Sequence, residues 1–327
     1  MSRTSIERSM RRVVLSGPGM GARWSAVAFV GDAVDPDLLG RALADEVEAV
    51  ERDASNWRPS SAVERLNAMP IGDWIALPPR LFEILEAATA IGRLSEGAFD
   101  IGVGDLVRAF GFGGGRRTPE PSAIAALAGR AAFDPPRALQ LDPVGRRGRR
   151  LAPLTVDLAG IAKGYGVDRM ARVMDDFGIA SHLVAIDGEM RAGAAKPDGR
   201  PWLIGQERPD AEARALAGVV ELTGAAIATS GDYRHVHEIG GRRVSHTMDP
   251  GRGAPLVGDL AQATVIAPTC MEADAWATAL LVAGREAGAA MALRRGLTAI
   301  LVTRAGETWS SLNAATGGVT VARGAMV

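Results

Sequence analysis

The 327-residue sequence contains little cysteine, little lysine and no long apolar run, and each absence excludes a class of structure. Cys270 is the only cysteine, so neither an intrachain disulfide nor a zinc site built from several cysteines can form. No stretch approaches the roughly 20 consecutive apolar residues of a membrane-spanning helix. The formal net charge of −1 argues against the basic surface that nucleic acid or anionic lipid attracts. These absences favour a soluble globular protein with a small, well-solvated partner.

The first residues, MSRTSIERSMRRVVLSGPGMG, contain arginines but no apolar run of signal-peptide length. With a single cysteine, folding does not depend on an oxidising compartment. The sequence as given is therefore expected to be cytoplasmic.

Apolar residues make up 47% of the chain, enough for a full core, and their spacing predicts helices and strands in irregular alternation. We expect a strand over residues 21–31, after a turn at Gly17–Gly19. The alternation favours an α+β fold over a doubly wound sheet. A single domain is expected over residues 13–323, with the Arg- and Pro-rich stretch 116–150 as an insertion or a lid. Helices are predicted from Pro36, from Pro79, over Ile161–Phe177 and over Glu272–Ala290, and further strands at LTVDL, HLVAIDG, GVVELTG, AAIATSGDY, ATVIAP and LTAILVT.

The segment TVDLAGIAKGYGVD, residues 155–168, joins a predicted strand to a predicted helix. The first turn of such a helix offers free backbone N–H groups, and its small residues let an anion approach them closely, which suits phosphate. Lys163 adds a positive charge there, and it is one of only two lysines in the chain, the other being Lys196. The alternative is that Asp157 caps the helix and Lys163 is a solvated surface residue.

A second candidate is the segment EADAWATAL, in which Asp274 and Thr278 lie four residues apart on a predicted helix. Their side chains would therefore project from the same face, and hard oxygen ligands of this kind are what Mg²⁺ accepts. The alternative is an acidic residue in the first turn of a helix and a threonine bonded back to its own helix.

A third candidate is the histidine-rich stretch that ends in HTMDPGRGAPL. His235 and His237 would share one face of an extended segment, as a metal pair or as solvated strand residues. His246 precedes the turn Asp249–Gly251, so it is either a base or phosphate contact, or a donor within the turn.

Two common nucleotide-binding motifs are excluded. Gly17, Gly19 and Ala22 match G-x-G-x-x-A, but a strand rather than a helix follows them. Lys163 is followed by Gly164, so the segment is not a Walker-type phosphate loop.

In order along the chain, these segments resemble the ApbE family, the FAD:protein FMN transferases. The resemblance extends from about Gly19 to about Gly284, apart from the Arg- and Pro-rich stretch. Any one of its motifs is weak, but nine in the family's order are specific. They are GMGARWS, SNWRPSSAVERLN, GAFDIGVGDLVRAFGFG, VDLAGIAKGYGVD, LVAIDGEMRAG, AIATSGDYR, HTMDPGRGAPL, ATVIAP and EADAWATALLVAG.

The resemblance implies a fold with antiparallel sheets and two lobes around an FAD cleft, and it assigns a role to particular residues. Mg²⁺ would be held by the carbonyl of Gly160 and the side chains of Asp274 and Thr278. Lys163 would neutralise the pyrophosphate of FAD, and His246 would take the acceptor's proton or stabilise the attacked phosphate. Asp274 and Lys163 are thus counted with His246 as catalytic. The FAD-binding positions would be Met20, Trp57, Ala98, Phe99, Asp100, Asp157, Lys163, Ser230 and Asp249.

The reaction implied by the resemblance is transfer of FMN from FAD to a threonine or serine hydroxyl of an acceptor protein, with release of AMP. Two alternatives stay open: hydrolysis of FAD to FMN and AMP, and FAD binding or delivery without chemistry. The sequence also departs from the family where Asp187-Gly188-Glu189 replaces the usual Gly-Gly-Asp. This change adds bulk and charge where close packing is expected.

Overall fold

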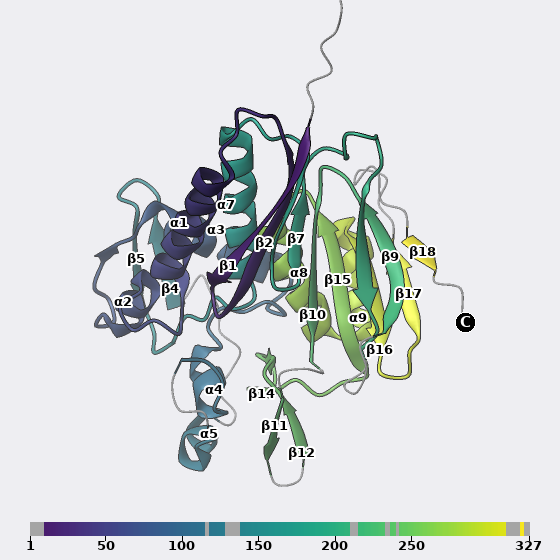
Figure 1. Cartoon of the computed structure of the whole chain (residues 1–327). Helices are drawn as coiled ribbons and strands as arrows, with labels where there is room; N and C mark the ends of the chain where they lie inside the picture. The colour runs from purple at the N-terminus through teal and green to yellow at the C-terminus, as the bar shows by residue number, and fades with distance from the viewer. Residues whose placement is uncertain are drawn as a thin grey trace, which may run out of the picture.

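The computed structural model describes residues 10–114, 118–127, 138–209, 215–232, 236–239, 242–311 and 321–323. Its framework is an eight-stranded sheet in which every pair of neighbours is antiparallel (Figure 1). The strands follow the order β1 (Arg11–Gly19), β2 (Ala22–Val30), β6 (His182–Ile186), β7 (Glu189–Ala192), β10 (Ala226–Gly231), β15 (Leu260–Ala267), β16 (Thr298–Thr303) and β17 (Thr308–Ser311).

One face of this sheet is covered by helices. Helix α1 begins where Asp35 accepts the N–H of Asp37 and Pro36 occupies the first turn, as the sequence predicts. Its buried stripe packs on α7 and on the first strands. The helices of this face are α1 (Pro36–Ala54), α7 (Ala162–Asp176), α8 (Cys270–Ala283) and α9 (Arg285–Arg295).

A three-stranded sheet covers part of the opposite face. It has the order β18 (Val321–Arg323), β9 (Leu216–Leu222) and β8 (Trp202–Glu207). Trp202 and Ile204 of β8 pack with Ile227 and Ile266 of the large sheet in one apolar cluster. The core therefore has two layers, one between sheet and helices and one between the two sheets.

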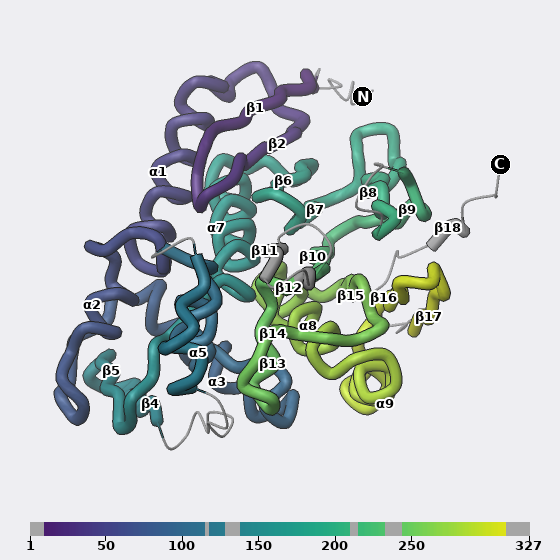
Figure 2. The backbone as a smooth tube through the Cα atoms, turned by 90° about the horizontal axis from the view of Figure 1, so that it is seen from below, coloured from purple at the N-terminus to yellow at the C-terminus, as the bar shows by residue number. Residues whose placement is uncertain are grey.

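Some of the remaining elements lie at one end of the large sheet. Helices α4 and α5 and the hairpins β11–β12 and β13–β14 lie at that end (Figure 1). Helix α5 and the β13–β14 hairpin also lie next to one another in the second view (Figure 2). The other small elements pack beside α1. The bounds are α2 (Ala62–Ala68), β3 (Ile75–Ala76), α3 (Pro79–Leu94), α4 (Gly104–Ala109), α5 (Pro121–Leu127), β4 (Leu139–Asp142), β5 (Arg147–Arg150), β11 (Val236–Ile239), β12 (Arg242–Ser245), β13 (Met248–Asp249) and β14 (Ala254–Pro255).

The α+β prediction with antiparallel sheets and packed helices is confirmed. Three local predictions are wrong. Residues 17–19 belong to β1, and the turn lies at Met20–Gly21, both with positive φ. The helix expected over Glu272–Ala290 is divided, because Gly284 takes a φ of 80° and starts a new helix. The segment LTVDL contributes only a single bridge, between Thr155 and Val103, rather than a strand.

The Arg- and Pro-rich stretch 116–150 contains regular elements in its described part. Helix α5 contacts α4, and β4 and β5 form a small sheet with β3. The role of this stretch as an insertion or a lid stays a prediction. The bounds of the single domain and the arrangement in two lobes also stay predictions. No helix in the described part of the chain combines the length and apolar character that crossing a bilayer requires.

Candidate active site

A cavity of ≈ 550 Å³ lies beside the carboxyl end of β10. The pairing of β7 with β10 covers only Ala226 and Ile227, and beyond it Thr229, Ser230 and Gly231 line the cavity. The turn between β6 and β7, the segment before α7 and helix α8 supply further walls. The cavity therefore reaches both the helix-covered side of the sheet and the side that faces β8.

Lys163 lies in the first turn of α7 and reaches into this cavity. Its Nζ lies 3.0 Å from Glu189 Oε1 and 3.5 Å from Asp187 Oδ2. Burial opposes the charged form of Lys163, but the charges of Glu189 and Asp274 outweigh it and raise the pKa of the amine. Lys163 is thus a half-buried, ion-paired cation, and the alternative of a solvated surface lysine is wrong.

Asp157 does not cap α7. The N-cap of this helix is Ile161, without a side-chain hydrogen bond, and the carboxylate of Asp157 instead accepts the N–H of Ala159 at 2.8 Å. Burial raises the pKa of this carboxyl, and the hydrogen bond from Ala159 opposes the rise. Asp157 lines the cavity, and its role in FAD binding stays a prediction.

Asp274 and Thr278 project from α8 toward the beginning of α7. The N–H of Gly164 donates to Asp274 Oδ2 at 3.0 Å. The Oγ1 of Thr278 lies 2.9 Å from Ser230 Oγ on β10, and a Cβ on Gly160 would lie 3.0 Å from the same Oγ1. The structure therefore brings Gly160, Asp274 and Thr278 together with Ser230.

The residues proposed for the metal fit Mg²⁺ by their chemistry. Burial and the charge of Glu189 raise the pKa of the Asp274 carboxyl above its usual range, and a cation beside Asp274 would lower the cost of that buried charge. Among the described residues, no three or more His, Cys, Asp or Glu side chains form a metal cluster, so such a site has to draw on hydroxyl and carbonyl oxygens. Magnesium accepts such ligands and keeps several waters.

The segment from Ala98 to Asp100 lines the cavity near Asp157. The Oδ1 of Asp100 accepts the N–H of Gly102 at 2.6 Å. His246 lines the cavity in a different wall, and its ring centroid lies 6.3 Å from that of Phe112. The cavity thus brings together ten of the thirteen predicted site residues: Ala98, Phe99, Asp100, Asp157, Gly160, Lys163, Ser230, His246, Asp274 and Thr278.

Three predicted residues do not line the cavity. Met20 occupies the turn between β1 and β2, where its N–H donates to Glu51, and Trp57 is 59% exposed. Asp249 accepts the N–H of Arg252 at 3.1 Å and so shapes the turn that follows His246. His235 lies outside the described residues, and the side chain of His237 is not among those described.

Sequence reasoning missed several residues of the site. Glu189 was noted only as a departure from the family, although it is the partner of Lys163 and is 3% exposed. Nothing in the sequence alone pairs Glu189 with Lys163, because an acidic residue in a strand is common. A hydrogen-bonded polar wall between the two sheets is formed by Gln206, Gln262, Thr229 and Thr264. No role was predicted for any of them from the sequence.

Comparisons with known proteins agree with this fold. The ApbE family model matches residues 20–301. The FAD:protein FMN transferase of Klebsiella pneumoniae is 33% identical over 91% of this chain and 87% of its own length, and that of Salmonella typhimurium is 34% identical with the same coverage.

Solved structures show the same similarity. The flavin transferase ApbE of Vibrio cholerae superposes with a TM-score of 0.82 at 30% identity, covering 93% of this chain and 98% of that one. The flavinyl transferase ApbE of Pseudomonas stutzeri gives a TM-score of 0.80 at 36% identity, with 92% and 95% covered. This chain therefore belongs to the ApbE family.

Proposed function

We propose that this protein is a Mg²⁺-dependent FAD:protein FMN transferase that moves FMN from FAD to a threonine or serine hydroxyl of an acceptor protein and releases AMP. The observation that carries the proposal is the cavity that gathers Lys163, Asp274, Thr278 and His246 around one space. The names of the similar proteins support the overall reaction.

The chain's residues have distinct roles in this proposal. Lys163 places an ammonium beside the pyrophosphate and offsets charge that builds up on its oxygens. The acceptor oxygen bonds to the phosphorus of the FMN half while the bond from that phosphorus to the AMP oxygen breaks. His246 accepts the proton that the hydroxyl loses, because an alcohol is a weak nucleophile without a base. Asp100 and Asp157 help to hold the dinucleotide in line for this attack.

The carbonyl of Gly160 and the side chains of Asp274 and Thr278 would hold Mg²⁺. The bound ion would supply positive charge to the pyrophosphate oxygens. Ser230 keeps the hydroxyl of Thr278 oriented through the 2.9 Å contact between their oxygens.

The Asp187-Gly188-Glu189 departure bears directly on this site. Both acidic side chains lie within 3.5 Å of Lys163 Nζ, so the ammonium already has partners before any dinucleotide binds. Lys163 therefore stays charged and fixed, while the added negative charge increases the need for a cation beside the pyrophosphate.

The test is incubation of the purified protein with FAD, with and without Mg²⁺ and an extract of its host, followed by in-gel flavin fluorescence and nucleotide analysis. We expect a covalently fluorescent host protein and AMP, both only with Mg²⁺. AMP and free FMN without a labelled protein, in an extract shown to contain unmodified acceptor, would instead favour hydrolysis. FAD that binds but stays intact would favour a delivery protein.

The two lysines of the chain provide a matched pair of variants. Lys163→Met removes the charge beside the pyrophosphate and is expected to lower the rate at least about 100-fold, the scale of losing one electrostatic donor in an active site. Lys196→Met is the control, because Lys196 donates to Pro201 O and stacks over Trp202. Equal activity of the two variants would contradict the role of Lys163.

A further inference from the structure

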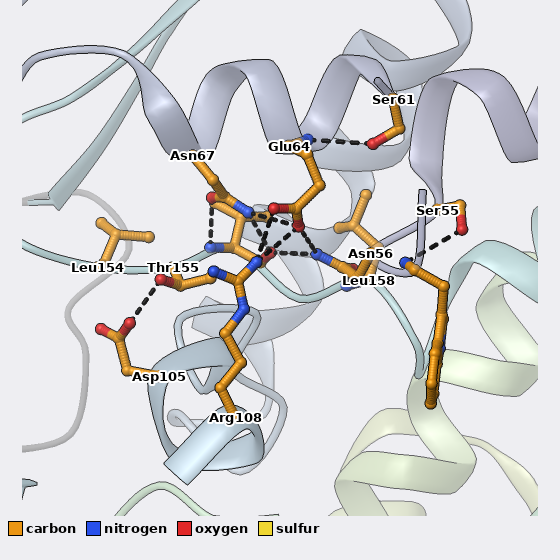
Figure 3. A network of polar contacts seen from close by, with 12 residues as sticks. Ser55, Asn56, Ser61, Glu64, Asn67, Asp105, Arg108, Leu154, Thr155 and Leu158 are labelled. Carbon is orange, nitrogen blue, oxygen red and sulfur yellow. Dashed lines mark hydrogen bonds and ion pairs between the residues drawn. The ribbon is translucent and has the colours of Figure 1, made fainter. Parts of the chain in front are cut away.

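Two asparagine side chains hydrogen-bond the backbone N–H and carbonyl groups of the segment that carries Asp157, as a neighbouring β-strand would (Figure 3). Asn67 accepts the N–H of Val156 at 2.8 Å and donates to its carbonyl at 3.0 Å. Asn56 accepts the N–H of Leu158 at 2.8 Å and donates to the Val156 carbonyl at 2.7 Å. The backbone on both sides of Asp157 is therefore held by side chains.

Glu64 fixes the orientation of both amides. Its Oε1 accepts from Nδ2 of Asn56 at 2.9 Å and from Nδ2 of Asn67 at 3.2 Å. A reversed amide would turn its oxygen toward the Glu64 carboxylate and the Val156 carbonyl, so only the observed orientation satisfies every group. Glu64 also pairs with Arg108, whose Nη2 donates to both carboxylate oxygens, at 2.8 Å to Oε1 and 2.7 Å to Oε2.

Arg108 connects this network to a second wall of the cavity. It lies on α4, and Val103 and Val107 beside it line the cavity. The N–H of Asp157 donates to Ile101 O at 2.7 Å, just before the same helix. The Asp157 segment is thus held between the two asparagines on one side and the start of the α4 region on the other.

We propose that Glu64, Asn56, Asn67 and Arg108 are positioning residues for dinucleotide binding, which set the place of Asp157 and of the α4 wall without touching the ligand. None of the four lines the cavity. The inference rests on the proposed function, because FAD is the ligand whose affinity reports the position of these walls.

The experiment measures the dissociation constant of FAD from the full-length protein in the presence of Mg²⁺, at a temperature where every variant is folded. Arg108→Gln removes the guanidinium that pairs with Glu64. Asn67→Leu removes the side chain that hydrogen-bonds both the N–H and the carbonyl of Val156. We expect Asn67→Leu to weaken FAD binding about tenfold, within the range found when supporting partners of a site are lost. Arg108→Gln should have a smaller effect, which Arg108→Lys should reverse in part.

Arg285→Gln is the matched control. Arg285 is exposed to a similar degree as Arg108, 48% against 43% for the side chains, and it also pairs with a glutamate on another element, Glu307. Arg285 lies in α9 and Glu307 in the connection between β16 and β17, and neither residue lines the cavity. Its loss should leave FAD binding unchanged.

Two results would overturn the inference. One is that Arg108→Gln and Asn67→Leu bind FAD as tightly as Arg285→Gln. The other is that their melting temperatures fall while FAD affinity is unchanged, which would show a role in stability alone. If the wild-type protein binds no FAD, the proposed function fails, and this inference fails with it. That outcome is distinguishable from a wild-type protein that binds FAD and variants that bind it equally tightly, which would overturn this inference alone.

Discussion

Gly164 lies in α7 where this helix packs directly against the beginning of α8. A Cβ at this position would lie 2.3 Å from the carbonyl oxygen of Cys270 and 2.8 Å from Cβ of Asp274. Its N–H is also the donor to the Asp274 carboxylate. A glycine here lets the two helices that carry Lys163 and Asp274 approach without a clash.

Gly164→Ala is expected to lower the free energy of unfolding by about 1–3 kcal/mol, because the added methyl meets backbone atoms that cannot move away. FAD binding should weaken as well, since Asp274 shifts with α8. Gly40→Ala in α1 is the control, because its Cβ would meet only Leu15 at 3.8 Å. That variant should gain up to about 1 kcal/mol, since alanine favours a helix over glycine. Urea unfolding of both variants measures the two effects. If the free energy of unfolding changed in the same direction in both variants, the steric requirement for glycine at position 164 would be contradicted.

Individual site residues were predictable only where their chemistry is unusual. Lys163 stood out because the chain has two lysines, and Asp274 and Thr278 because their spacing places them on one helix face. Glu189 and Gln262 could not be predicted, since an acidic residue or an amide in a strand is ordinary until the fold brings it to a cavity wall. Trp57 illustrates the opposite case. It lies in a motif that resembles the family's and was predicted to bind FAD, but it is exposed and does not line the cavity.

At the scale of elements, the start of α8 is anchored by a residue of α7. The carboxylate of Asp168 accepts the N–H groups of Cys270 and Met271, each at 2.9 Å, and pairs with Arg191 at 2.6 Å. These N–H groups belong to the first turn of α8, where no partner exists within the helix. Asp168 therefore sets the position of the helix that carries Asp274 and Thr278.

Asp168→Asn retains one acceptor and loses the charge, so we expect a loss of about 1–3 kcal/mol in the free energy of unfolding. FAD binding should require more Mg²⁺ because α8 is no longer fixed. Asp176→Asn, at an exposed position of the same helix, is the control and should change neither quantity. Thermal unfolding and a Mg²⁺ titration of FAD binding test this. If the Asp168→Asn variant is destabilised but FAD binding needs no more Mg²⁺ than in the wild type, Asp168 contributes to stability only and does not position the residues proposed for the metal.

At the scale of the whole molecule, the sequence predicts the class of fold better than its connections. The apolar periodicity identified α1, α3 and α7 and most strands of the large sheet, because their buried stripes are long. The strand order and the short pairing between β7 and β10 depend on contacts between distant segments, which periodicity does not contain. The cavity results from that pairing, so its existence could be expected only from the family resemblance.

The stability of the whole molecule should fall on mild acidification because of His182, at the start of β6. His182 is 3% exposed, and its Nδ1 lies 2.9 Å from Ile179 O, which suits a neutral ring that donates from this nitrogen. Burial lowers the pKa of His182 below 6.5, the hydrogen bond to Ile179 opposes this, and so does the charge of Asp175.

The unfolded chain therefore binds a proton at a higher pH than the folded protein does. Stability is full above the unfolded pKa of about 6.5 and is lost as the pH falls from there toward the lowered folded pKa. Replacing the histidine by an uncharged residue, His182→Gln, lowers stability at neutral pH but removes this contribution. The difference in unfolding free energy between wild type and variant should thus shrink from pH 7.5 to pH 5, as measured by urea unfolding across that range. A difference that stays constant would show that His182 does not titrate with folding.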